Sequence, residues 1–227
     1  MSDAHSSALD AGHPEGLAHH FEDLDQQNES ASIGMWAFLA QEVMFFGGLF
    51  ACYLVFRQLY PQAFYEGSHH LDVFWGTFNT VVLICSSLTM ALGVREAQLG
   101  NGKRVALYIV ATMALAFVFL GVKTVEYSHK YHDGLIPALS WAPGPDAHPH
   151  LLTFFGLYFA MTGMHALHML IGLVLMVVVA LKALRGRYTP DNYIGVEMLG
   201  LYWHFVDLVW IFLFPLLYLL NRHVGHG

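Results

Sequence analysis

The sequence has few charged residues, and its long apolar stretches contain almost none. Only 12% of the 227 residues are Asp, Glu, Lys or Arg, against about 25% in a soluble domain. Five apolar runs stand out, at roughly 33–56, 73–94, 105–122, 151–181 and 198–221. Each run is close to or longer than the roughly 20 residues that a helix needs to cross a bilayer core. The sequence therefore predicts an all-α bundle of five transmembrane helices.

Other absences exclude further classes of protein. No stretch alternates apolar and polar residues over about ten positions, so the spans are not strands of a membrane barrel. The two cysteines, Cys52 and Cys85, fall inside predicted spans and imply no disulfide framework. The formal net charge is −7 and no basic patch occurs, which argues against nucleic acid as a partner. No internal repeat or separate soluble domain is visible.

Residues 1–32 lack Lys and Arg but hold seven acidic residues, which alone account for the net charge. We expect this segment to be a mobile polar tail. It lacks the basic start and short apolar core of a signal peptide, so we expect the first helix to direct insertion. Its histidines are weak candidates for metal ligands. Residues 33–222 form the predicted membrane domain, with spans at about 33–57, 72–97, 104–128, 150–182 and 193–221, and residues 223–227 form a short second tail.

The basic residues favour one orientation, with the N-terminus inside and the C-terminus outside. Cytoplasmic loops of membrane proteins carry an excess of Lys and Arg. Six basic residues cluster in two short loops on the side of the N-terminus, and four lie on the other side: Arg95, Lys103, Arg104, Lys182, Arg185 and Arg187 against Arg57, Lys123, Lys130 and Arg222.

Ionisable residues at bilayer depth are costly, so they face protein or water and are functional candidates. Glu42 lies in the middle of the first span. It is either a carboxyl group in a proton or ion path or a protonated acid bonded to a neighbouring helix, and both interpretations remain open. Glu126 follows Lys123 by three residues, so the two side chains share a helix face, and an ion pair is favoured over a transport role.

The fourth and fifth spans carry histidines and further acids. His165 and His168 share a helix face, but the fourth span offers no acid beside them, which favours hydrogen-bonded structural histidines over metal ligands. Glu197, His204 and Asp207 are spaced so that all three can face one polar seam on the fifth span.

Small and polar residues indicate where the helices meet. Gly47 and Gly48 in the first span predict a close helix contact, as do Gly163, Ala166 and Gly172 in the fourth. The second span carries a stripe suited to hydrogen bonds between helices, made of Thr77, Asn79, Thr80, Ser86, Ser87 and Thr89. Asn101-Gly102 predicts a tight turn with left-handed backbone.

Five stretches resemble one family, subunit III of the haem-copper oxidases. "LAQEVMFFGGLFACY" is similar to the family segment that carries an intramembrane glutamate, here Glu42. "NTVVLICSSLTM", "VEYSHKYHDG" and "TGMHALHMLIG" resemble three further segments, and "GLYWHFVDLVWIFLF" is close to the family's A-W-Y-W-H-F-V-D-V-V-W signature. The match runs from about residue 33 to 221. The chain departs from the pattern around the paired histidines and in the longer loop "LSWAPGPDAHPH".

The resemblance implies a five-helix, non-catalytic subunit of a proton-pumping cytochrome c oxidase. It implies haem and copper in partner subunits and none in this chain, direct packing against subunit I, and association with subunit II and other subunits of the respiratory chain. It also implies support of stability and proton uptake, with phospholipid near Lys182 and Arg187. A multi-pass location in a bacterial plasma membrane follows.

Alternatives remain at the level of the sequence. One is an oxidase that uses quinol instead of cytochrome c, and another is an accessory subunit of a nitric oxide reductase. An independent transporter would use Glu42, Glu126 and Asp207, although no inverted repeat supports it. A haem-binding cytochrome would use His165, His168 and His204, of which His165 and His204 suit ligation from facing helices at similar depth.

Overall fold

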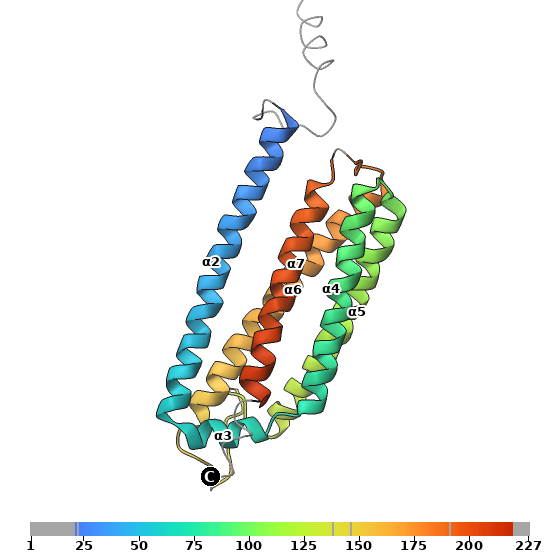
Figure 1. Cartoon of the computed structure of the whole chain (residues 1–227). Helices are drawn as coiled ribbons and strands as arrows, with labels where there is room; N and C mark the ends of the chain where they lie inside the picture. Colours follow the sequence, from blue (N-terminus) through green and yellow to red (C-terminus); the bar gives the residue numbers. More distant parts are fainter. Residues whose placement is uncertain (1–20, 22, 138, 146, 191, 220–227) are drawn as a thin grey trace, which may run out of the picture.

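A computed structural model describes residues 21, 23–137, 139–145, 147–190 and 192–219, and this part of the chain is helical apart from its connections. Five helices are long and apolar enough to cross a membrane, as the sequence predicts. They are α2 (Leu24–Leu59), α4 (Val73–Gln98), α5 (Gly102–His132), α6 (Leu151–Leu184) and α7 (Ile194–Phe214), the last continued by η1 (Pro215–Leu219). A short helix, α3 (Pro61–His69), lies across one end of the bundle (Figure 1).

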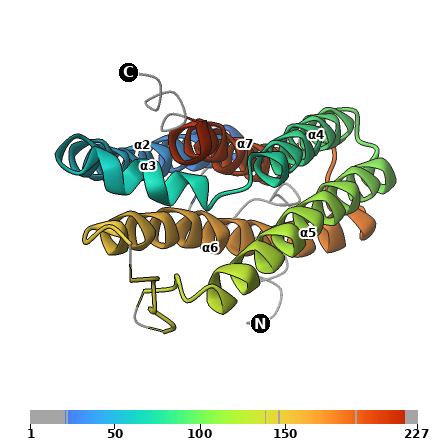
Figure 2. The same ribbon diagram turned by 90° about the horizontal axis from the view of Figure 1, so that it is seen from below.

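The helices form two layers. Figure 2 shows α7 between α2 and α4 in one layer, and α5 beside α6 in the other. α7 contacts α2, α4 and α6, so it is the central helix of the bundle. In its apolar stretch, 56% of the residues are buried. In the apolar stretch of α2, which packs along one edge against α6 and α7, 22% of the residues are buried. The largest buried side chains, Trp203 and Trp210, both come from α7.

The first helix begins earlier than its apolar pattern indicates. The carboxylate of Asp23 accepts a hydrogen bond of 2.7 Å from the backbone N–H of Gln26, which caps a helix that starts at Leu24. Residues 24–32, which composition assigns to the polar tail, therefore continue α2. The rest of that tail, residues 1–20 and 22, and the C-terminal segment 220–227 lie outside the described residues.

Two of the glycine predictions need correction. A Cβ built on Gly47 or Gly48 would meet nothing within 4 Å, so these residues do not mark a close contact inside this chain. In the turn between α4 and α5, the left-handed residue is Gly100, with φ of 74°, one position before Asn101. Gly102 has another reason to be small, because a Cβ there would lie 2.7 Å from the carbonyl oxygen of Ala183 on α6.

Candidate functional site

A closed polar cluster lies between α5, α6 and η1. Lys123 Nζ donates to Glu126 Oε2 at 2.9 Å and to the hydroxyl oxygens of Tyr158 and Tyr218 at 3.1 Å each. Both hydroxyl groups donate in turn to Glu126 Oε1 at 2.7 Å. An ammonium group has three N–H donors, so every donor of Lys123 has a partner. The cluster therefore satisfies both buried charges without water.

Aromatic rings surround the same ammonium group. Lys123 Nζ lies 5.2 to 5.7 Å from the ring centroids of Tyr127, Tyr158, Trp210 and Tyr218. A cation within about 6 Å of an aromatic face is attracted by the ring's quadrupole. The predicted pair of Lys123 with Glu126 is thus present, but it lies in the bundle interior and includes two tyrosines that the sequence reasoning missed. A tyrosine placed in an apolar span offers a hydroxyl group that needs a partner, and this is the signal that was available.

Glu42 on α2 and His168 on α6 form a second buried pair. The distance from His168 Nε2 to Glu42 Oε2 is 3.1 Å, and both residues are 8% exposed. His168 Nδ1 lies 2.8 Å from the carbonyl oxygen of Met164, which can only accept, so Nδ1 carries a hydrogen. The contact between Nε2 and the carboxyl group then contains a single proton, held either by Glu42 or by the imidazole.

Part of the polar stripe of α4 bonds to neighbouring helices, whereas Asn79 has no hydrogen-bond partner among the described residues. Asp207 Oδ2 accepts a hydrogen bond of 3.4 Å from Ser86, and the indole N–H of Trp203 donates to Ser86 at 3.1 Å. His204 Nδ1 lies 2.7 Å from Ser87 Oγ. Asp207 Oδ1 has no hydrogen-bond partner among the described residues. The seam between α4 and α7 is therefore polar at its centre.

Glu197 does not join that seam. It is partly exposed and lines a groove of about 300 Å³ between α4 and α7, together with Arg95, Gln98 and His204. Asp207 is 3% exposed and is not among the residues that line the groove. Glu197 therefore shares the groove with His204, whereas Asp207 is buried and bonds to Ser86.

His165 and His168 lie in different surroundings although they share a helix. His165 is 1% exposed, packs against the rings of Phe119 and Trp210 at centroid distances of 5.6 and 5.3 Å, and has no hydrogen-bond partner for either ring nitrogen in the described part of the chain. The predicted hydrogen bonds are present for His168, whereas no described residue supplies one to His165. The described residues also contain no group of three or more His, Cys, Asp or Glu side chains arranged to hold a metal.

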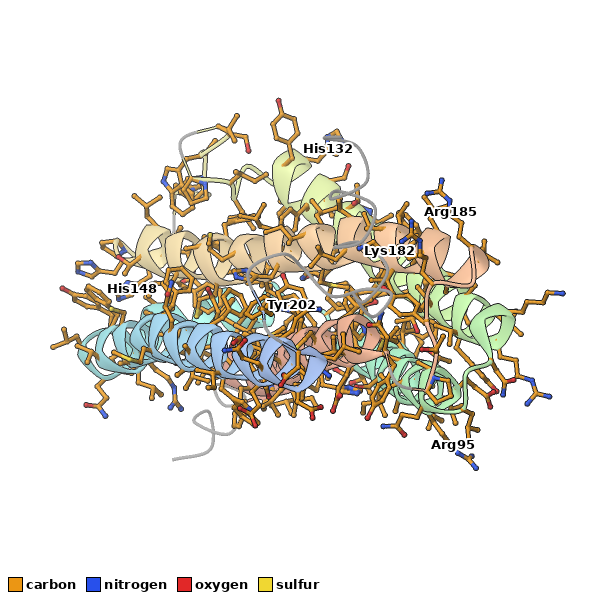
Figure 3. The ribbon with its side chains drawn as sticks, turned by 90° about the horizontal axis from the view of Figure 1, so that it is seen from above. Arg95, His132, His148, Lys182, Arg185 and Tyr202 are labelled. Atoms are coloured by element: carbon orange, nitrogen blue, oxygen red, sulfur yellow. The ribbon has the colours of Figure 1, made fainter. Side chains whose placement is uncertain are left out.

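Lys182 and Arg187 are exposed near the end of α6, where Figure 3 shows Lys182 beside Arg185. The lipid contact expected there stays a prediction. The cavities include an apolar groove of about 490 Å³ between α4 and α5, lined by Trp75, Val118 and Val125 and bordered by Asp72. The sequence reasoning did not identify this groove, because its walls come from two helices.

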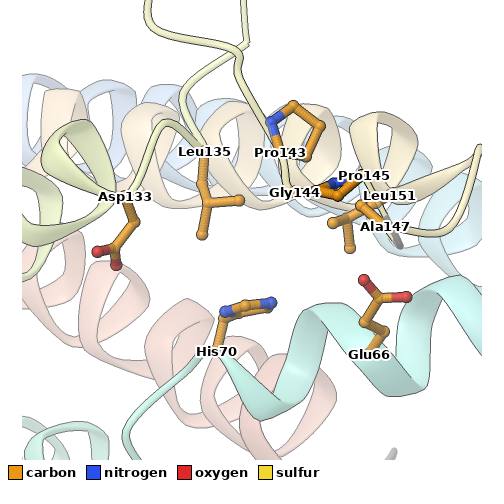
Figure 4. Close-up of a pocket in the computed structure, with 9 residues that line it drawn as sticks. All are labelled: Glu66, His70, Asp133, Leu135, Pro143, Gly144, Pro145, Ala147 and Leu151. Carbon is orange, nitrogen blue, oxygen red and sulfur yellow. The ribbon is translucent and has the colours of Figure 1, made fainter.

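A cleft of about 510 Å³ opens at the end of the bundle that carries α3 (Figure 4). Glu66 and His70 reach it from the α3 side and Asp133 from the end of α5, opposite the loop with Pro143 and Pro145. Partial burial lowers the pKa of His70, and the charge of Lys130 acts in the same direction, while Glu66 and Asp133 act against it.

The buried polar pairs and the five long apolar helices define an integral membrane protein, and comparisons with known proteins identify its family. The family model described as cytochrome c oxidase subunit III matches residues 149–222. Cytochrome c oxidase subunit 3 of Corynebacterium diphtheriae is 35% identical over 192 residues, which cover 84% of this chain and 88% of the relative. The protein of the same name from Thermostichus vulcanus is 35% identical over 191 residues, or 84% and 87% of the two chains.

Quinol oxidase subunit 3 of Bacillus subtilis is also similar, at 28% identity over 206 residues, 87% of this chain and 92% of the relative. The chain therefore belongs to the cytochrome c oxidase subunit III family, and it is a subunit III of a haem-copper oxidase. The resemblance inferred from the five motifs is confirmed.

The three carboxyl groups that a transporter would use are not brought together. Glu42 pairs with His168, Glu126 with Lys123, and Asp207 with Ser86. Each carboxyl group joins a different set of helices, which fits a role in holding the bundle together better than a shared ion path.

Proposed function

We propose that this chain is the non-catalytic subunit III of a bacterial cytochrome c oxidase, which packs directly against subunit I and associates with subunit II. Haem and copper reside in those partners, and this chain supports stability and proton uptake of the catalytic subunit. It spans the plasma membrane with its N-terminus inside, and Lys182 and Arg187 contact phospholipid head groups.

The observation that carries the proposed role in proton uptake is the pair of Glu42 with His168. One proton lies in a buried contact between α2 and α6, at a depth where most neighbours are apolar. Transfer of that proton between carboxyl and imidazole exchanges a neutral pair for an ion pair, and the surrounding low dielectric makes the balance sensitive to nearby charge. To serve proton uptake, the pair would bind a second proton, giving a neutral Glu42 carboxyl group beside an imidazolium, and would then release it to the catalytic neighbour.

Sequence identity to known relatives supports cytochrome c as the electron donor. The two relatives named cytochrome c oxidase subunit 3 above are 35% identical to this chain, whereas the quinol oxidase subunit 3 is 28% identical. A quinol-using enzyme is the second candidate, since relatives of both names are similar to this chain over most of its length.

Purification in mild detergent through a tag on this chain tests the proposal. We expect a haem absorbance spectrum, a large multi-span partner and a copper-bearing partner, with faster oxidation of reduced cytochrome c than of a quinol. Preferential oxidation of the quinol would replace the donor and keep the subunit role. A folded, colourless chain that purifies alone would contradict the proposal.

A further inference from the structure

A small cavity adjoins the Lys123 cluster between α5, α6 and α7, and the exposed Thr124 lies at its edge. Its volume is about 90 Å³, and its walls include Tyr127 from α5, His165 from α6 and Trp210 from α7. It also borders Lys123 and Ala166. The cavity thus lies where three transmembrane helices meet.

His165 brings unused hydrogen-bonding capacity to this cavity. A neutral imidazole has one donor and one acceptor, and an imidazole buried without partners loses the hydrogen bonds that water gives it in the unfolded chain. His165 is 1% exposed, and its two ring nitrogens have no partner among the described residues. Buried polar side chains in folded proteins nearly always have a partner, from the protein or from ordered water.

The neighbouring protein groups do not supply that partner. Phe119 and Trp210 present aromatic rings, and the donors of Lys123 are all used within its own cluster. Thr162 donates to the carbonyl oxygen of Tyr158, so the Tyr127 hydroxyl group donates to Thr162 and keeps an acceptor lone pair. The cavity therefore combines a donor and an acceptor on His165 with an acceptor on Tyr127.

We propose that this cavity is an internal water-binding site of the subunit, in which water bonds both His165 and Tyr127. A water molecule occupies about 30 Å³ in the liquid, so a volume of about 90 Å³ accommodates up to about three. Buried water is stable where two to four polar partners surround it. The site gives His165 a role that neither its spacing from His168 nor the family match assigns.

Cryo-electron microscopy of the intact oxidase, at a resolution that resolves ordered water, tests the site directly. We expect density within about 3 Å of a ring nitrogen of His165 and of the Tyr127 hydroxyl oxygen. A dry cavity, or one filled by a lipid chain or by a side chain of another subunit, would overturn the proposal.

A double-mutant cycle supplies an independent measurement in the same complex. Ala166→Val places two methyl groups at the cavity wall and displaces water, which leaves His165 unpaired, so the melting temperature of the subunit should fall by about 3 °C. The same substitution in a His165→Phe background removes no hydrogen bond and should change the melting temperature by less than about 1 °C.

Ala51→Val on the exposed side of α2 is the matched control and should have no effect in either background. A rise in melting temperature on Ala166→Val alone would mean that the substitution fills a dry cavity. An equal fall in both backgrounds would mean that the effect is overpacking. Either result would overturn the water site.

Discussion

At the scale of residues, three of the buried carboxyl groups, those of Glu42, Glu126 and Asp207, differ in how fully their hydrogen bonds are satisfied. Glu126 accepts from one ammonium and two hydroxyl groups, Glu42 contacts one imidazole, and Asp207 keeps one oxygen without a partner among the described residues. A buried charge that loses its partner costs far more than the pair contributes. The three sites therefore respond differently to substitution.

Lys123→Met should destabilise the subunit by about 3–5 kcal/mol, because it leaves Glu126 buried without its cation. The double variant Lys123→Met with Glu126→Leu should recover most of that loss, since neither charge remains. Denaturant unfolding of the purified complex, followed through this subunit, measures both. Lys103→Met, an exposed position at the start of α5, is the matched control and should stay within about 0.5 kcal/mol of the parent. A single variant as stable as the control would contradict the role of the cluster.

Glu42→Gln should leave assembly intact, because an amide N–H can still donate to Nε2 of His168, but it removes the exchangeable proton of the pair. We expect slower or less durable turnover of the complex, measured as oxygen consumption over many cycles. Gln41→Glu, one position away on the exposed side of α2, tests whether any charge change at this depth has the same effect. Unchanged long-term activity of Glu42→Gln would count against a proton-related role.

The sequence identified most of these residues singly, but it did not show which of them pair across helices. The spacing of three between Lys123 and Glu126 predicted their pair, because it lies within one helix. Glu42 and His168 were both identified but not joined, since 126 residues separate them and only the packing of α2 on α6 brings them together. Tyr218, 95 residues from Lys123, was missed for the same reason.

At the scale of helices, α6 and α7 approach each other at one glycine. A Cβ on Gly172 would lie 2.9 Å from a ring carbon of Trp203 and 3.1 Å from one of Tyr202. A Cβ on Gly163, nine residues earlier on α6, would meet nothing within 4 Å. The composition of this stretch predicted a small-residue contact on α6, but not which glycine makes it, because that depends on the side chains that α7 presents.

Gly172→Val should separate the two helices and destabilise the subunit by about 1–3 kcal/mol, because Trp203 is fully buried and cannot move aside freely. Gly163→Val on the same helix provides the comparison, with the same loss of glycine and no clash. Thermal unfolding of both variants in the complex measures the difference. Equal effects would show that the loss comes from the helix backbone and not from the contact.

The packing of α3 against the loop at residues 139–150 should depend on pH through His70. The pKa of His70 is lowered in the folded chain from its ordinary value of about 6.5, so the unfolded chain binds the proton more readily. Protonation of His70 does not affect the free energy of unfolding above about pH 6.5. Stability is lost as the pH falls from there toward the pKa of His70 in the folded chain.

Hydrogen exchange of α3 at pH 7.5 and 5.5, corrected for intrinsic rates, measures that loss. His70→Gln should reduce the difference between the two pH values, whereas His69→Gln, at the neighbouring exposed position, should retain it. Identical behaviour of the two variants would contradict the assignment to His70.

At the scale of the whole molecule, the number of spans followed from composition alone, since an apolar run of about 20 residues has few alternatives to a membrane helix. The order of helices in the two layers did not follow, because hydropathy gives no lateral neighbours. The start of the first helix was also displaced to Leu24, where a capping carboxylate decides the boundary and hydropathy does not.

The orientation predicted from the basic residues can be read by labelling. Gln62→Cys on α3 should react with a membrane-impermeant maleimide added to intact cells, and Lys103→Cys at the opposite end should react only after permeabilisation. Cys52 and Cys85 are replaced by Ser in both variants to remove background. The reverse pattern would invert the proposed topology.

The Lys123 cluster also bears on the order in which the bundle closes. Sliding α5 by one residue would turn Lys123 by about 100° and move its charge away from the aromatic rings. The cluster therefore fixes the register of α5 against its neighbours. The last partner, Tyr218, is 95 residues further along the chain, and until it arrives one ammonium donor is unmatched. Docking of the last helix therefore completes the hydrogen bonds of an ion pair that α5 already carries, and a subunit that misaligns its helices retains an unmatched ammonium donor inside the membrane.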